Sequence, residues 1–179
     1  MRFIIFFILI FVNLIMQATI VQSIGYNFIS PNTSIIIIIS YAYLREDLES
    51  GAIGFISGLL QDVFFGGILG FYALLGFFTG YVSSKFFKRF YSINPLPVLF
   101  MVFTGTFFYE TIFYFFHFLF RAKLNYIYYF NNIILIEMVY NVLITIPIYY
   151  FIYNIDRKLL IREKPKRYIF ESSGDNNER

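Results

Sequence analysis

The chain has 179 residues, of which 59% are hydrophobic and only 14% are charged, and its mean hydropathy is +0.68. A soluble domain has about a quarter of its residues charged, so this composition excludes an ordinary soluble protein and indicates an all-α integral membrane protein. The chain contains no cysteine, which excludes disulfides, thiol catalysis and cysteine metal sites, and its single histidine, His117, excludes a multi-histidine site.

Apolar stretches along the chain predict six membrane-spanning helices. They cover residues 3–25, 33–44, 51–65, 68–84, 98–120 and 132–153. The first follows Arg2 and is longer than the apolar region of a signal peptide, about 7–15 residues, so we expect an uncleaved span. The second and third are shorter than the roughly 20 residues of a straight crossing, so they could form a short hairpin and leave five crossings. Between them, residues 45–50 (REDLES) are too polar for hydrocarbon and are expected to form a loop.

Lysine and arginine are distributed unevenly about these spans. With six spans, twelve of the 14 basic residues lie on the side of the amino terminus, and only Arg121 and Lys123 lie on the other side. The positive-inside rule therefore predicts that both ends are cytoplasmic and favours an even number of crossings. We expect residues 1–156 to form the membrane domain and residues 157–179 a basic cytoplasmic tail with a disordered end. The net charge of +3 follows from this bias and does not indicate a nucleic-acid partner, whereas the segment 156–167 could also touch anionic lipid headgroups.

Small residues and one acid recur every three or four positions along the third span. They are Gly51, Gly54, Gly58 and Asp62. This spacing places them on one face of a helix, and small residues in membrane helices allow close approach of a second helix. The fourth span carries a matching set of Ala73, Gly76 and Gly80. We therefore expect Asp62 to point into protein and not into lipid.

Other polar side chains form stripes in the remaining spans. Thr106, Glu110, His117 and Arg121 share a stripe in the fifth span, Glu137, Asn141 and Thr145 in the sixth, and Asn13 and Gln17 in the first. A lone carboxylate at membrane depth costs at least about 2.5–3.5 kcal/mol, so each acid needs a partner, and His117 and Arg121 are the nearest cationic candidates. Two interpretations of Glu110 and Glu137 stay open. These acids could form hydrogen bonds between helices, or they could line a cavity or a proton path.

Two adjoining segments carry a family resemblance. "PNTSIIIIISYAYLRED" followed by "GAIGFISGLLQDVFFGGILGFYALLGFFTGY" resembles MreD, the rod shape-determining membrane protein family, over about a quarter of the chain. The matching residues are Pro31, Tyr41, Arg45, Glu46, Gly54, Gly58, Leu59, Asp62, Gly66 or Gly67, Leu69 and Gly70. Asn32 and Asp47 depart from the family pattern, which usually has Asp and often Gly there. The resemblance and the spacing of the glycine face, which adds Gly51, together predict a structural or partner-binding motif of Arg45, Glu46, Gly51, Gly54, Gly58, Asp62, Gly67 and Gly70.

The resemblance implies a non-enzymatic protein without catalytic residues, cofactor or metal, in the bacterial cytoplasmic membrane. Such proteins pair with MreC and work with MreB filaments, RodZ, the RodA glycosyltransferase and its transpeptidase. Together they organise side-wall peptidoglycan synthesis and maintain cell shape. The fold is similar to the six-helix substrate-binding component of energy-coupling-factor transporters, so the alternative function is a vitamin-binding transporter subunit. A third possibility, an ion or proton channel, depends on Glu110 and Glu137 alone.

Overall fold

The computed structural model describes the backbone of residues 2–21, 30–45, 47–65, 69–88, 94–121 and 125–174, and side chains within 5–19, 30–45, 47–65, 69–88, 94–116 and 125–159. This part of the chain is helical and contains no strand. Its elements are α1 (Arg2–Met16), the π-helix η1 (Gln17–Val21), α3 (Thr33–Leu44), α4 (Asp47–Phe65), α5 (Phe71–Phe87), α6 (Leu96–Arg121), α7 (Tyr126–Tyr129), the π-helix η2 (Phe130–Ile134) and α8 (Leu135–Gly174). Apart from the turn at residues 69–70, the described residues of every predicted span are helical, which confirms the all-helical class.

Several helix ends differ from the predicted bounds. The REDLES segment was expected to be a loop, but α4 already begins at Asp47. The physical reason is that Asp47 and Glu49 lie in the first turn, where carboxylates interact favourably with the amino end of the helix dipole. Helix α5 likewise extends beyond the predicted span, to Phe87, with Lys85 in its last turn, where a cation is favourable.

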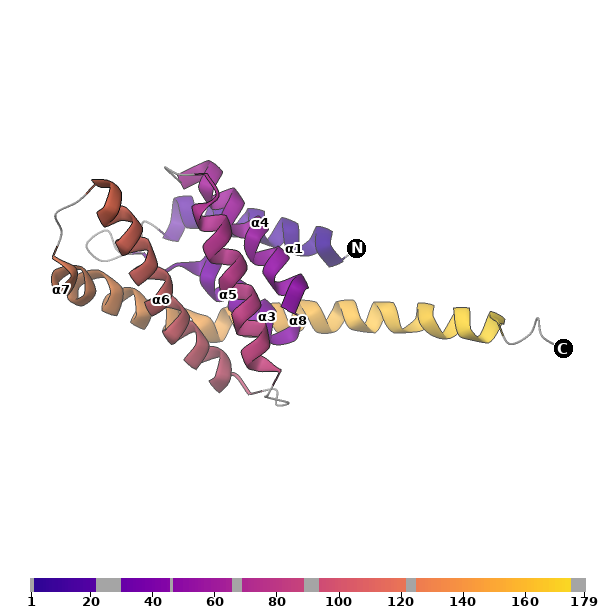
Figure 1. The fold of residues 1–179 in the computed structure, drawn as a ribbon. Coiled ribbons are helices and arrows are strands. Elements are labelled where there is room, and N and C mark those ends of the chain that lie inside the picture. The colour runs from indigo at the N-terminus through magenta and orange to yellow at the C-terminus, as the bar shows by residue number, and fades with distance from the viewer. Residues whose placement is uncertain are drawn as a thin grey trace.

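The last helix is much longer than the predicted span. α8 has 40 residues, about 60 Å at 1.5 Å per residue, and runs far past the other helices (Figure 1). Residues 157–174, which were expected to be a tail, therefore continue the helix, and residues 175–179 lie outside the described part of the chain. The division into a membrane domain and a tail stays a prediction.

The short helix α3 occupies the centre of the bundle. Ten of its twelve residues are buried, because α1, α4, α5, α6 and α8 all contact it. A helix that is apolar on every side is stable only when other helices cover it, and the run of five isoleucines from residue 35 to 39 meets that condition. The Asn32 side chain accepts a hydrogen bond from the Ile35 N–H and caps the helix, as Asp would.

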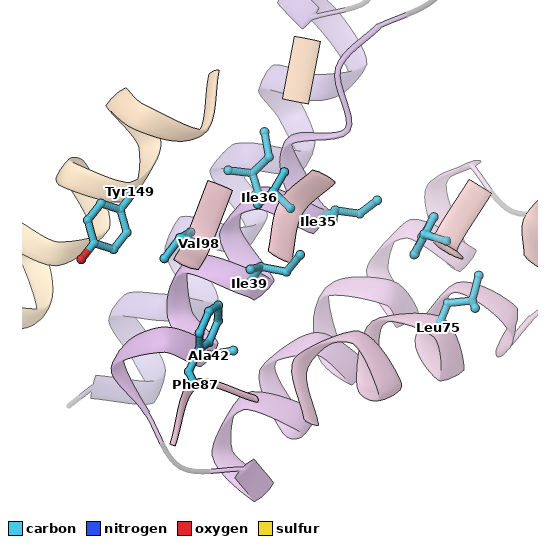
Figure 2. Packing of buried hydrophobic residues seen from close by; sticks show 10 residues of the cluster. Ile35, Ile36, Ile39, Ala42, Leu75, Phe87, Val98 and Tyr149 are labelled. Atoms are coloured by element: carbon cyan, nitrogen blue, oxygen red, sulfur yellow. The ribbon is translucent and has the colours of Figure 1, made fainter. Parts of the chain in front are cut away.

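Two buried clusters hold the bundle together. Figure 2 shows the first, in which α3 contributes Ile35, Ile36, Ile39 and Ala42, and the surrounding helices contribute Leu75, Phe87, Val98, Val102, Tyr109 and Tyr149. The second joins α1 to the bundle through Phe6, Ile10, Ile37, Tyr41, Ile53, Ile152 and Leu159. Since Phe6 and Leu159 belong to the same cluster, the amino end of α1 lies on the same side of the bundle as the exit of α8 (Figure 1).

Length and composition qualify two of the described helices for crossing a membrane. They are Leu96–Phe116 and Tyr126–Leu159, and two further helices, Ile5–Thr19 and Thr33–Leu44, are apolar but shorter. Large apolar side chains on the outer faces of α6 and α8 are exposed, for example Phe108 and Leu143. These surfaces suit a lipid environment, while the number of crossings stays a prediction.

Candidate functional site: the glycine–aspartate helix hairpin

Helices α4 and α5 form a hairpin in which the two backbones touch. A Cβ atom added to Gly54 would lie 2.1 Å from the carbonyl oxygen of Gly76, and one added to Gly76 would lie 2.2 Å from that of Gly54. The same holds one turn further along α4, where a Cβ on Gly58 would lie 2.0 Å from the Tyr72 carbonyl oxygen. Such distances leave no room for any side chain. The prediction that the glycine face of the third span meets another helix is confirmed, and that helix is α5 of the same chain.

The ends of the glycine contact are formed differently. On the side of the chain termini, a Cβ on Gly80 would lie 2.3 Å from the Ser50 carbonyl oxygen, so backbone touches backbone there too. Gly51 instead lies beneath the aromatic ring of Phe77, whose Cε2 would be 2.9 Å from an added Cβ. A ring can move more easily than a backbone, so Gly51 is the most tolerant position of the stripe.

Asp62 lies at the opposite end of this contact and binds the start of α5. One carboxylate oxygen accepts the N–H groups of Gly70 and Ala73, each at 3.0 Å, and the other accepts the N–H of Tyr72 at 2.9 Å. The first N–H groups of a helix have no acceptor within the helix, and they carry the positive end of its dipole. A buried carboxylate from the neighbouring helix therefore satisfies three donors at once and needs no cation.

Gly70 makes this capping arrangement possible. Its φ angle is +94°, in the left-handed region that favours glycine, and it turns the chain immediately before α5. The motif residue Gly67 lies outside the described residues. The aspartate that appeared isolated among glycines in the sequence is thus the amino cap of the next helix, and the glycines supply the close approach and the turn that bring it there.

A second set of polar contacts lies at the other end of the hairpin. The Arg45 guanidinium forms an ion pair with Asp156 of α8, and the two side chains are only 11% and 6% exposed. The carbonyl oxygen of Arg45 accepts a hydrogen bond from the Ser84 hydroxyl of α5 at 2.7 Å. Arg45 thereby ties the turn before α4 to both α5 and α8. The motif residue Glu46 lies outside the described residues.

A more exposed ion pair adjoins it. The Lys88 ammonium lies 2.8 Å from a carboxylate oxygen of Asp47 and holds the pKa of that carboxyl below its usual value. A cavity of about 410 Å³ lies beside both pairs and is lined by Arg45, Glu49 and Ser84 among others. Asp156 was missed by the sequence analysis, which assigned it to the domain edge. The available signal was an acid at the end of the last span, in a row of basic residues.

The buried polar residues of α6 and α8 form a network at the level of the Asp62 end. Glu110 accepts a hydrogen bond from the Tyr129 hydroxyl at 3.0 Å. The Asn141 amide donates to the Thr106 hydroxyl at 3.0 Å, and its oxygen accepts the Asn32 N–H at 2.8 Å. The hydrogen bonds that join different segments of the chain in this network are therefore donated by neutral groups.

Glu137 completes this network on α8. It is 7% exposed and is hydrogen-bonded to Asn141, one helical turn further along. The side chains of His117 and Arg121, proposed as cationic partners of the acids, lie outside the described residues. Among the described side chains, the partner of Glu110 is a tyrosine hydroxyl, which the sequence analysis did not anticipate.

Comparison with protein families gives the decisive observation. The family model of the rod shape-determining protein MreD matches residues 1–158. The chain belongs to the MreD family. It is therefore a rod shape-determining membrane protein, and the family is a structural component of cell-shape determination. No curated protein and no solved structure matches the chain.

Proposed function

We propose that the protein is a six-span scaffold of the bacterial cytoplasmic membrane that pairs with an MreC-like protein and helps to organise side-wall peptidoglycan synthesis. MreB, RodZ, RodA and its transpeptidase are the further partners that membership of the family suggests. In this proposal the protein carries out no catalysis, and its contribution is a defined arrangement of helices. The observation that carries it is the α4–α5 hairpin, whose backbone contacts and three-donor cap define a rigid shape at the motif positions.

The hairpin also constrains where a partner binds. The glycine face of α4 is filled by α5, so a partner helix cannot enter that groove without separating the hairpin. The motif therefore acts on the partner indirectly, by fixing the outer faces of the bundle. Arg45 and its Asp156 contact fix the same bundle to α8 at the opposite end.

The test is a pull-down from native membranes with the tagged protein after mild solubilisation. We expect an MreC-like protein to be recovered with the wild type and lost with Gly58→Leu, while the control Val82→Leu, on the exposed side of α5, retains it. Recovery with Gly58→Leu at normal protein level would refute the role of the hairpin in partner binding. Recovery of a transporter coupling protein with paired ATPases would instead establish the vitamin-uptake alternative.

The proposed orientation places both ends in the cytoplasm. Because the chain has no cysteine, single cysteines introduced at Leu48 and at Tyr126 report the side of each position without background. Both side chains are exposed, at 74% and 37%. We expect only the Tyr126 variant to react with an impermeant thiol reagent in intact cells. Equal reactivity of both variants would contradict the topology.

A further inference from the structure

An apolar groove of about 590 Å³ runs along one side of the bundle, between α1 and α8. Its wall includes Ile5, Ile8 and Val12 of α1, Ile37 of α3, and Ile148 and Ile155 of α8. Ile8 and Val12 are 55% and 47% exposed, so the groove opens outward and is not an enclosed cavity. Its volume lies within the range of about 300–1,000 Å³ that small-ligand sites have.

The length of the groove matches one leaflet of a bilayer. From Ile5 to Met16 along α1 is about 16 Å at 1.5 Å per residue, and α8 contributes the same length from Ile144 to Ile155. The hydrocarbon core of a bilayer is about 30 Å thick, so the groove covers roughly half of it. A membrane-spanning partner helix would need the full thickness, whereas one acyl chain needs only this half.

The residues around the groove indicate the level at which it lies in the membrane. Helix α3 contributes to the wall, and it ends just before Arg45. The Arg45–Asp156 ion pair marks the membrane boundary at that level, because charged side chains belong at the water-facing edge of the hydrocarbon. Asp156 directly follows Ile155, so the groove ends where the headgroups begin.

The positively charged residue Lys158 lies at this end of the groove. Lys158 follows Ile155 by three residues and Phe151 by seven, so it continues the face of α8 that lines the groove, and its side chain is exposed. Exposed Arg157 lies beside it. At the far end Asn13 is already hydrogen-bonded to Ser34 and does not call for a polar ligand. The groove thus has one uncharged end, where Asn13 and Thr33 are hydrogen-bonded within the protein, and one positively charged end.

We propose that this groove binds one acyl chain of an anionic phospholipid, with the headgroup phosphate at Lys158 and Arg157. The lipid comes from the leaflet on the Lys158 side, which is the cytoplasmic leaflet in the proposed topology. A bound lipid would fill the gap between α1 and α8 and hold the first helix against the bundle. The inference is separate from partner binding, since it concerns the purified protein in lipid alone.

The experiment uses the purified full chain in vesicles of phosphatidylcholine containing a small fraction of phosphatidylglycerol with a photoreactive acyl chain. Cross-linked peptides are identified by mass spectrometry, and the same lipid with a choline headgroup serves as the comparison. We expect phosphatidylglycerol to label the groove residues of α1 and α8 in preference to phosphatidylcholine. Equal labelling by both lipids would overturn the assignment of an anionic headgroup.

Two pairs of matched variants test the two ends of the site. Lys158→Gln should lower groove labelling about fivefold, the effect of one basic residue near a charged membrane, whereas Lys85→Gln, another exposed lysine at the end of a span, should not. Val12→Trp should abolish the labelling by filling the groove, whereas Val82→Trp, at a similarly exposed valine on α5, should not.

Equal effects of the two lysine variants would overturn the proposal, because they would mean unspecific attraction of the lipid to the protein. Persistence of the labelling in Val12→Trp would also overturn it. If the Lys158→Gln protein does not insert into the vesicles, the comparison of phosphatidylglycerol with phosphatidylcholine on the wild-type protein tests the proposal by itself. Absence of groove labelling by either lipid would overturn it as well.

Discussion

Gly54→Ala measures how much of the stability depends on backbone contact between α4 and α5. The new Cβ atom would lie 2.1 Å from the Gly76 carbonyl oxygen and 2.6 Å from its carbonyl carbon. Both atoms belong to the backbone, so no rotamer change relieves the overlap and the helices must separate. Overpacking of this kind costs about 1–3 kcal/mol. Because the overlapping atoms belong to rigid backbone, we expect the cost of Gly54→Ala at the upper end of this range.

The intrinsic gain of alanine over glycine in a helix offsets part of that cost. This gain is about 1 kcal/mol, so we expect a net loss of about 2 kcal/mol in the free energy of unfolding. Gly105→Ala is the matched control in α6, because its Cβ would meet only the terminal carbon of the Ile39 side chain, at 2.9 Å. That contact yields by a small shift of Ile39, so this control should be as stable as the wild type or slightly more stable.

The assay is unfolding by sodium dodecyl sulfate in mixed micelles, followed by far-ultraviolet circular dichroism. Helix separation should also raise the accessibility of a cysteine introduced on the buried face of α5. The reasoning would be refuted if Gly54→Ala and Gly105→Ala unfolded at the same detergent fraction. It would also be refuted if Gly54→Ala were destabilised without any change in cysteine accessibility.

Five further substitutions test the two ends of the hairpin by the same unfolding assay. Asp62→Ala leaves three helix donors without their acceptor and should lower the free energy of unfolding by at least about 2 kcal/mol. Asp62→Asn keeps one acceptor oxygen and should lower it less. Wild-type stability of both variants would contradict the capping role. Arg45→Gln leaves Asp156 buried without its cation and should cost about 3–5 kcal/mol, most of which Asp156→Asn in the same chain should restore; additive losses would contradict direct pairing. The Lys88 hydrogen bond lowers the pKa of Asp47 in the folded state, so its stabilisation is complete above the ordinary aspartate pKa, about 3.9, and is lost as the pH falls through the lower folded value. The stability difference between wild type and Lys88→Gln should therefore shrink at acid pH, and a constant difference would rule out the ion pair as its source.

The glycine face could be predicted from the sequence because it depends only on helical periodicity. Spacings of four residues place Gly54, Gly58 and Asp62 on one face whatever the rest of the chain does. The matching spacing in the fourth span then made α5 the natural neighbour. Helical spacing is a local property of the sequence, and the short distances between the α4 and α5 backbones agree with the face that it predicts.

The contacts of the acids could not be predicted in the same way. Asp62 was expected to need a partner and it has one, but the donors are backbone N–H groups, which every residue except proline possesses and which no residue type reveals. Arg45 and Asp156 are 111 positions apart, and only the packing of α3 against α8 brings them together. Helix α3 was short enough in the sequence to suggest a hairpin, whereas the structure shows that its length suits a buried position at the centre of the bundle.

The proposed effect of the motif on a partner has to be indirect, because the motif lies inside the bundle. Each glycine of the α4 face lies against α5, and Asp62 is 2% exposed, so none of these residues offers a surface to another protein. A larger side chain at Gly54 or Gly58 moves α5 relative to α4, and α5 carries Ser84, which holds the backbone of Arg45. Arg45 in turn contacts α8, one of the two described helices long and apolar enough to cross a membrane. Loss of partner binding in a glycine variant would therefore report a displaced bundle face, and the partner's own contact residues are to be sought on the exposed sides of α6 and α8.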